Sequence, residues 1–209
     1  MKGLGYLLIL LVPGLLHGQS PEKSVQQKFV SGGMIRMHLE AGGYTVSAGD
    51  SENIRVTYEA RSEEQLKQVK VEIKSYGGSA DIYVTDTPNG NFHATIEVPR
   101  RSNLRVRLTA GELVVEDVEG DKDLEVRAGR LQADVPHPEQ YGHRDASVLT
   151  GSINASVFDI SKGGLFRSFE QRGPGKYRLH THVMTGRDRS ALKRVVGYLE
   201  FLGVRANTR

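Results

Sequence analysis

Histidines, carboxylates and arginines are the side chains of this sequence whose types and spacing could do chemistry. His180 and His182 stand two residues apart on a segment expected to be a strand, so both imidazoles would share one face, with Asp188 close by. Such a trio could hold zinc or nickel. Two histidines without cysteine or a His-Glu-x-x-His spacing do not define a site, and a solvated strand is the favoured interpretation. We therefore predict no metal and no cofactor.

Catalytic arrangements are equally hard to find. Ser, His and Asp all occur, but no G-x-S-x-G motif accompanies them, and the absence of cysteine excludes a thiol nucleophile. Six carboxylates gather in one short stretch: Glu112, Glu116, Asp117, Glu119, Asp121 and Asp123. They could bind calcium or act as paired acids, yet their spacing fits neither an EF-hand loop nor a calcium-binding nonapeptide repeat. We expect a solvated acidic turn and a protein that is not an enzyme.

Four arginines make up the candidate ligand-binding set: Arg105, Arg107, Arg127 and Arg130. Arg105 and Arg107 alternate with aliphatic residues, so they share the solvated face of a strand. Alignment with Arg127 and Arg130 on a neighbouring strand would create a basic stripe for sulfated or carboxylated glycans or lipid phosphates. The alternative is a set of surface charges that discourages association between sheets. A net charge of +3 is too mild for a nucleic-acid arm, so no nucleic acid is expected.

The elements that position these residues are predicted to be strands. Apolar residues alternate with polar ones along much of the chain, as in 54–58, 69–73, 82–84 and 104–108. Glycines separate these segments, and Asn89-Gly90 looks like a hairpin turn between 82–84 and 93–98. Helical periodicity is confined to Ser62–Gln68 and Arg189–Leu202, and Gly197 weakens the second of these.

Near-repeats centred on glycine are the most informative part of the sequence. Residues 104–113 match residues 124–131 after a two-residue contraction, and 146–157 form a third copy. The glycines at positions 111, 129 and 151 are 18 and 22 residues apart. Looser copies lie at 41–46 and 183–186. A repeat of this length predicts stacked β-rungs, whereas an antiparallel sandwich is the alternative; we favour hairpins in the first half and stacked rungs in the second.

The repeats resemble the bacterial putative adhesin family. The matching segments are Ala110-Gly111-Glu112-Leu113, Val118-Glu119-Gly120, Ala128-Gly129-Arg130-Leu131 and Thr150-Gly151-Ser152-Ile153. The resemblance covers roughly residues 30–186, and the chain departs from the pattern at 136–138 and 162–175. It implies an all-β, single-domain, toast-rack or solenoid-like stack of short strands. It also implies surface binding, and it brings no catalytic residues.

The N-terminus resembles a secretory leader, because Lys2 precedes a run of apolar residues that is too short to span a bilayer. An uncleaved anchor is the alternative. We expect cleavage after Gly18 and no membrane-spanning segment afterwards. The expected organisation is a signal peptide at 1–18, a linker at 19–28, a repetitive β domain at 29–188 and a C-terminal tail at 189–209 that includes a short helix.

These observations favour an exported, non-enzymatic protein of the bacterial envelope or surface. Its expected role is adhesin-like binding or scaffolding, with an envelope polymer or protein as partner, in the periplasm, at the surface or secreted. A periplasmic carrier of a lipid or other amphiphile is the second hypothesis. A polysaccharide-active enzyme on a β-helix is the third.

Overall fold

The structure of the chain, a computed structural model, describes residues 21–184 and 197–202. The expected leader and Asp188 lie outside these ranges. The strands are β1 (Glu22–Lys28), β2 (Met34–Leu39), β3 (Gly42–Gly49), β4 (Asn53–Glu59), β5 (Lys70–Tyr76), β6 (Ser79–Thr85), β7 (His93–Pro99), β8 (Asn103–Glu116), β9 (Lys122–Asp134), β10 (Tyr141–Ala155), β11 (Ile160–Arg172), β12 (Tyr177–Val183) and β13 (Gly197–Leu202). Besides the short helix α1 (Glu63–Gln68), the described part holds two 3₁₀ turns, Pro138–Gln140 and Ser156–Phe158. The predicted all-β class is confirmed.

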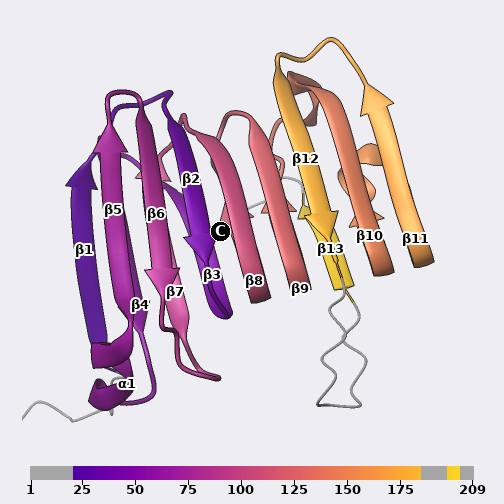
Figure 1. The fold of residues 1–209 in the computed structure, drawn as a ribbon. Coiled ribbons are helices and arrows are strands. Elements are labelled where there is room, and N and C mark those ends of the chain that lie inside the picture. Colours follow the sequence, from indigo (N-terminus) through magenta and orange to yellow (C-terminus); the bar gives the residue numbers. More distant parts are fainter. Residues whose placement is uncertain (1–20, 185–196, 203–209) are drawn as a thin grey trace, which may run out of the picture.

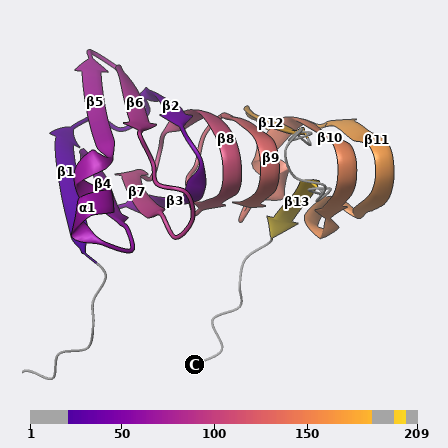
Figure 2. The same ribbon diagram turned by 60° about the horizontal axis from the view of Figure 1, so that its bottom comes forward.

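The strands belong to one sheet that folds into two walls (Figure 1). The first half of β8 pairs with β2, and its second half pairs with β3. Strands β9 and β10 bend in the same way, so each long strand contributes to both walls. The first wall runs β5-β6-β2-β8-β9-β12-β10-β11, and the second runs β1-β4-β7-β3-β8-β9-β13-β10-β11. Figure 2 shows the long strands curving around the interior between the walls.

Glycines mark the bend between the walls. Gly42 pairs with Gly111, and Gly111 pairs with Gly129, so the three glycines stack across neighbouring strands. Gly111 and Gly129 have φ angles of +121° and +138°, which residues with a side chain rarely adopt. A Cβ atom on Gly129 would lie 1.8 Å from the carbonyl oxygen of Gly111. The predicted equivalence of these glycines is therefore confirmed, and its reason is close backbone approach.

The register between β8 and β9 differs from the predicted alignment. Leu104 pairs with Lys122 and Val106 pairs with Leu124, so the offset stays at 18 residues along the whole pair. The two-residue contraction expected between residues 104 and 124 is wrong, because these two parallel strands pair one-to-one from end to end. One consequence is that Lys122 of β9 lies opposite Leu104 of β8, at a position where the neighbouring strand has an aliphatic residue.

The third copy is equivalent to the others but is not their neighbour. Strands β12 and β13 lie between β9 and β10, so that Val126, Val183 and Val148 form one row. In the first wall, β12 therefore lies between β9 and β10, although both precede it in the chain. The copy at 183–186 is in this row through Val183, and residues 185 and 186 lie outside the described ranges.

The first half of the chain holds one hairpin, but not the expected one. Strands β5 and β6 form an antiparallel hairpin that turns at Gly77-Gly78. Strand β6 pairs with β5 and β2, whereas β7 pairs with β4 and β3, so the predicted hairpin across Asn89-Gly90 is wrong. That loop instead crosses from one wall to the other. The predicted helix near residue 62 is confirmed: the Ser62 hydroxyl accepts a hydrogen bond of 3.4 Å from the Gln65 N–H.

Both ends of the expected β domain extend further than predicted. The segment expected to be a linker contains β1, which pairs antiparallel with β4. The segment expected to be a helical tail contains β13, which pairs in parallel with β9 and β10. Leu199 and Phe201 are two residues apart and fully buried, and this alternation suits a strand that covers the interior.

Aliphatic side chains fill the space between the walls. Val106, Leu124 and Val126 are completely buried, as are Met37 on β2 and Val46 on β3. Near β11 the filling becomes aromatic, with Phe158, Phe169 and Phe201 in mutual contact at centroid distances of 5.9 to 6.4 Å. Among residues 21–184 and 197–202, no helix is both long and apolar enough to cross a membrane.

Candidate functional site

The outer face of the first wall carries rows of polar side chains. Because the strands pair in register, outward residues of successive strands line up. One row contains Asp81, Arg36, Arg105, Asp123, His180 and Asp145, from six neighbouring strands. The next row contains Tyr83, His38, Arg107, Glu125, His182 and Ser147. The predicted placement of Arg105 and Arg107 on one solvated face is observed.

These arginines are largely neutralised by carboxylates. Arg105 lies 3.0 Å from Asp123, and Arg107 lies 2.9 Å from Asp123 and 3.0 Å from Glu125. Partial burial opposes ionisation of Asp123, but the hydrogen bond and charge of Arg107, together with His180 and Arg105, lower the pKa of this carboxyl. The face is therefore a lattice of paired charges and not the predicted basic stripe.

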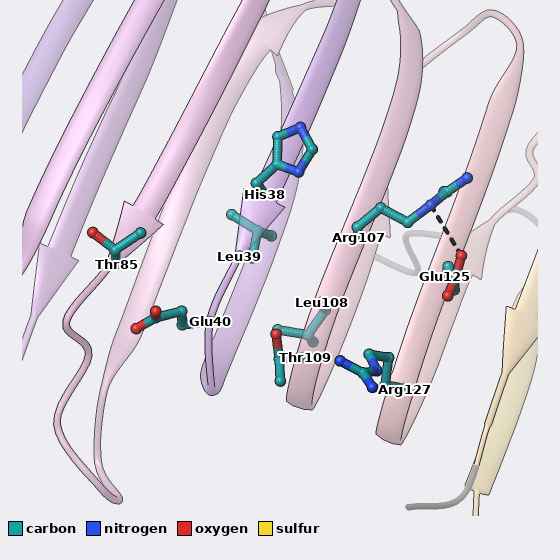
Figure 3. A pocket seen from close by; sticks show the side chains of 9 residues that line it. All are labelled: His38, Leu39, Glu40, Thr85, Arg107, Leu108, Thr109, Glu125 and Arg127. Carbon is teal, nitrogen blue, oxygen red and sulfur yellow. Dashed lines mark ion pairs between the residues drawn. The ribbon is translucent and has the colours of Figure 1, made fainter.

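A depression on this face brings two of the predicted arginines together (Figure 3). Its volume is about 270 Å³, and it is lined by His38, Leu39, Glu40, Thr85, Arg107, Leu108, Thr109, Glu125 and Arg127. We call it the β2–β9 groove. Arg127 is exposed and follows Glu125 by two residues on the same face of β9. Unlike Arg107, it makes no ion pair with any described residue. The groove thus offers one cation, Arg127, that has no ion-pair partner in the described part of the chain, beside Arg107, which Glu125 holds in place.

The fourth predicted arginine lies elsewhere. Arg130 follows the bend at Gly129, so it belongs to the second wall, where it lies 3.6 Å from Glu112. It therefore does not share the groove. Arg127 and Arg130 are only three residues apart in the sequence, but the bend at Gly129 lies between them and places them on different walls.

Side chains on neighbouring strands support His38 at the rim of the groove. His38 stacks on Tyr83 with ring centroids 5.0 Å apart and planes 8° from parallel. Lys74 lies 5.3 Å from the centroid of the same tyrosine ring. Contacts across three neighbouring strands therefore hold the His38 side chain upright at the rim of the groove.

The histidine pair of β12 belongs to the same polar face. His180 contacts the carboxylate of Asp145, and His143 lies 3.3 Å from the other oxygen of that carboxylate. His182 Nδ1 lies 2.6 Å from the Ser147 hydroxyl. The two imidazoles share a face as predicted, yet they have different partners. Over the described ranges, no group of three or more histidines and carboxylates is arranged to hold a metal ion.

A buried lysine is the polar feature that the motifs did not reveal. Lys122 is 1% exposed, its ammonium contacts the Tyr141 hydroxyl, and its nitrogen lies 4.7 Å from the centroid of the Tyr141 ring. Burial lowers the pKa of Lys122 to about 8, against the opposing effect of Glu119 and Asp121. Burial also raises the pKa of Tyr141. The spacing of 18 residues between Gly111 and Gly129 could have revealed this residue: applied to the whole of β8 and β9, it places Lys122 opposite Leu104.

Comparison with known proteins gives a likeness of fold. Neither protein-family models nor curated proteins match the sequence. Among solved structures, the chain is similar to a putative cell adhesion protein from Clostridium sporogenes, with a TM-score of 0.51 and 11% identity over 89% of this chain and 100% of that one. It also aligns with a putative adhesin from Parabacteroides merdae, with a TM-score of 0.31 and 12% identity over 54% and 52% of the two chains. A putative adhesin from Bacteroides fragilis aligns with a TM-score of 0.27 and 10% identity over 88% and 98%.

The likeness to the clostridial protein concerns the fold, because the identity is low. The all-β architecture is thus shared with a structure described as a putative cell adhesion protein. The groove residues themselves receive no assignment from this comparison.

Proposed function

We propose that the chain is an exported bacterial envelope or surface protein that acts as a non-enzymatic, adhesin-like binding or scaffolding module. Its ligand-binding site in this proposal is the β2–β9 groove. The observation that carries the proposal is Arg127, an exposed guanidinium without an ion-pair partner among the described residues, in a depression that Arg107 also lines. A guanidinium binds carboxylate and sulfate through two parallel hydrogen bonds.

An acidic polysaccharide fits the chemistry of the groove. Arg127 supplies charge for a uronic acid or sulfate group, and the hydroxyls of Thr85 and Thr109 can donate to or accept from sugar hydroxyls. Glu40 adds an acceptor. The groove is a depression on a sheet surface whose rows of outward polar residues continue across the neighbouring strands, which suits a segment of a longer polymer better than an enclosed small molecule.

We also infer that the stacked strands form the toast-rack, solenoid-like architecture that the sequence repeats predict. The in-register parallel pairing of β2 and β3 with β8, and of β8 with β9, supports this. The antiparallel strands β1, β4, β5 and β11 then form the two ends of the stack.

The carrier hypothesis receives less support from the packing. An acyl chain would need space between the walls, and there the described side chains of β8 and β9, such as Val106, Leu124 and Val126, are in close contact with no exposed area. An enzyme receives no supporting observation from the groove, where Arg107 and Glu125 are paired with each other.

Binding to a defined acidic polymer tests the proposal. The full chain is run in affinity electrophoresis through gels that contain polygalacturonate or, for comparison, neutral dextran. We expect retardation by polygalacturonate alone, and about tenfold weaker binding for Arg127→Gln, since a charge-assisted hydrogen bond contributes roughly 1.5 to 3 kcal/mol.

Arg55→Gln is the matched control. Arg55 is exposed on β4 of the second wall, where it pairs with Glu97 at 3.2 Å, and its loss changes the net charge equally. The proposal predicts that this variant binds as the parent does. Equal weakening in both variants would mean that net charge alone attracts the polymer, and the groove would not be the site.

A further inference from the structure

The terminal strand β11 has features that the groove does not explain. It pairs with β10 on one side only and lies at the opposite end of the sheet from β1 and β5 (Figure 1). Two large apolar side chains project from its middle: Leu165 is 61% exposed and Phe166 is 77% exposed. The backbone at Phe166 has a φ of +50°, so the bend of the strand holds this ring at an outward corner.

Two cations flank the exposed ring. Lys162 pairs with Ile153 and Arg167 pairs with Val148, and both partners are buried on the inner side of β10. Paired residues share a face, so both cations point toward the open end of the interior. Their hydrogen bonds go to backbone: Lys162 donates to the Ser168 carbonyl at 2.8 Å, and Arg167 donates to the Gly163 carbonyl at 2.7 Å. Neither has a carboxylate partner within the described part of the chain.

The cations and the ring share one cavity. Lys162, Gly163, Phe166, Arg167 and Ser168 line a depression of about 310 Å³ at this end of the molecule. An apolar side chain that stands between cations with no carboxylate partner among the described residues matches the boundary of an anionic membrane, where acyl chains lie beneath phosphates. We propose that the β11 end of the molecule docks on an anionic lipid surface, with Phe166 inserted and Lys162 and Arg167 at the phosphates.

A lipid surface fits this end better than a further strand does. Charged residues on the inward face of an edge strand are a recognised device against pairing with another chain. Lys162 and Arg167 occupy that face of β11. A bilayer needs no backbone pairing, and it can accept the ring and neutralise both charges at once. This inference uses none of the groove residues, so it stands or falls separately from polysaccharide binding.

A single tryptophan reports the docking directly, since the sequence contains none. Phe166→Trp in the full chain places the probe at the proposed contact. Tyr76→Trp is the matched control, because Tyr76 is 62% exposed at the β5–β6 turn, at the other end of the sheet. Each variant is mixed with vesicles of phosphatidylcholine or of an equimolar mixture of phosphatidylcholine and phosphatidylglycerol.

We expect the emission of Phe166→Trp to shift to the blue, and brominated acyl chains to quench it, in the anionic vesicles only. Tyr76→Trp should show neither effect. Adding Lys162→Gln and Arg167→Gln to the reporter chain should weaken binding by about fivefold per cation. The pair Lys70→Gln and Lys74→Gln, which removes the same charge at the far end, should not.

Three results would overturn the proposal. The first is the absence of any shift, and the second is an equal shift in Tyr76→Trp or in neutral vesicles. The third is a shift of Phe166→Trp that depends on protein concentration without vesicles, which would make this end a contact between two copies of the chain.

Discussion

Replacing the buried lysine of β9 together with its tyrosine partner should stabilise the protein at neutral pH. Lys122 lies in the interior row between Leu104 on β8 and Leu179 on β12. Its pKa falls from 10.5 to about 8, so the ammonium form is destabilised by burial. Each pKa unit corresponds to about 1.4 kcal/mol, which sets the cost of the charge at about 3 kcal/mol below pH 8. Lys122→Leu would remove this cost and continue the leucine row.

The partner of Lys122 reduces the gain. Without the ammonium, the Tyr141 hydroxyl loses its hydrogen-bond partner, at a cost of roughly 1 to 3 kcal/mol. The single variant should therefore change stability little. Lys122→Leu combined with Tyr141→Phe leaves no unpaired polar group from the pair, and we expect it to be about 2 kcal/mol more stable than the parent at pH 7.

The dependence of stability on pH distinguishes removal of the buried charge from better packing as the cause of the gain. The folded-state pKa of Lys122 is below its unfolded value of 10.5. The unfolded chain thus binds more protons between pH 8 and 10.5, and the stability of the parent should rise across that window. The double variant should lack this rise. Lys70→Leu, at an exposed position, should keep it.

Urea denaturation followed by circular dichroism at several pH values measures these differences. The reasoning is refuted if the double variant is less stable than the parent at neutral pH. It is equally refuted if parent and double variant respond alike between pH 8 and 10.5.

Three further changes test the fold and the polar face. Gly129→Ala should destabilise by several kcal/mol, seen as a large fall in Tm, because its Cβ would meet the Gly111 carbonyl at 1.8 Å; a Tm like that of Gly163→Ala, where the added Cβ meets nothing within 4 Å, would contradict the close approach. Ser62→Ala should cost about 1 kcal/mol in urea denaturation through loss of the α1 cap, and Ser62→Asp should restore it. Although partial burial opposes it, the hydrogen bond and charge of Arg107 lower the pKa of Asp123, so the stability that this carboxylate contributes is present at neutral pH and is lost as the pH falls below its ordinary pKa of 3.8. Asp123→Asn should reduce the loss of stability in urea denaturation below that pH, and an unchanged loss would show that Arg107 does not stabilise the carboxylate.

Local signals in the sequence predicted the parts of the fold that depend on neighbouring residues. Alternation placed Arg105 and Arg107 on one face, and the spacing of Gly111 and Gly129 identified the bend. Ser62 marked the helix start correctly. Each of these features is set within about one rung, where side-chain direction and backbone conformation are local properties.

Long-range placement could not be predicted in this way. The position of β12 and β13 between β9 and β10 depends on packing between segments that are far apart in the chain, such as Leu124 and Thr181. The charge partners of the basic residues were missed for the same reason, because Arg107 and Glu125 meet only through the register of β8 and β9. Lys122 was overlooked because a contraction was assumed where these two strands pair one-to-one.

The insertion of β12 and β13 between β9 and β10 separates the order of synthesis from the order of assembly. Strands β8 and β9 can join the stack as they emerge, since β8 pairs with β2 and β3, and β9 pairs with β8, all of which precede them in the chain. Strand β10 cannot be linked to β9 at that stage, because β12 and β13, which pair with both of them, are made last. Until residue 202 has been made, the sheet keeps a gap with two unpaired edges. Completion of the fold therefore waits for the C-terminal segment, and the time spent with open edges is the period in which the chain is most exposed to aggregation.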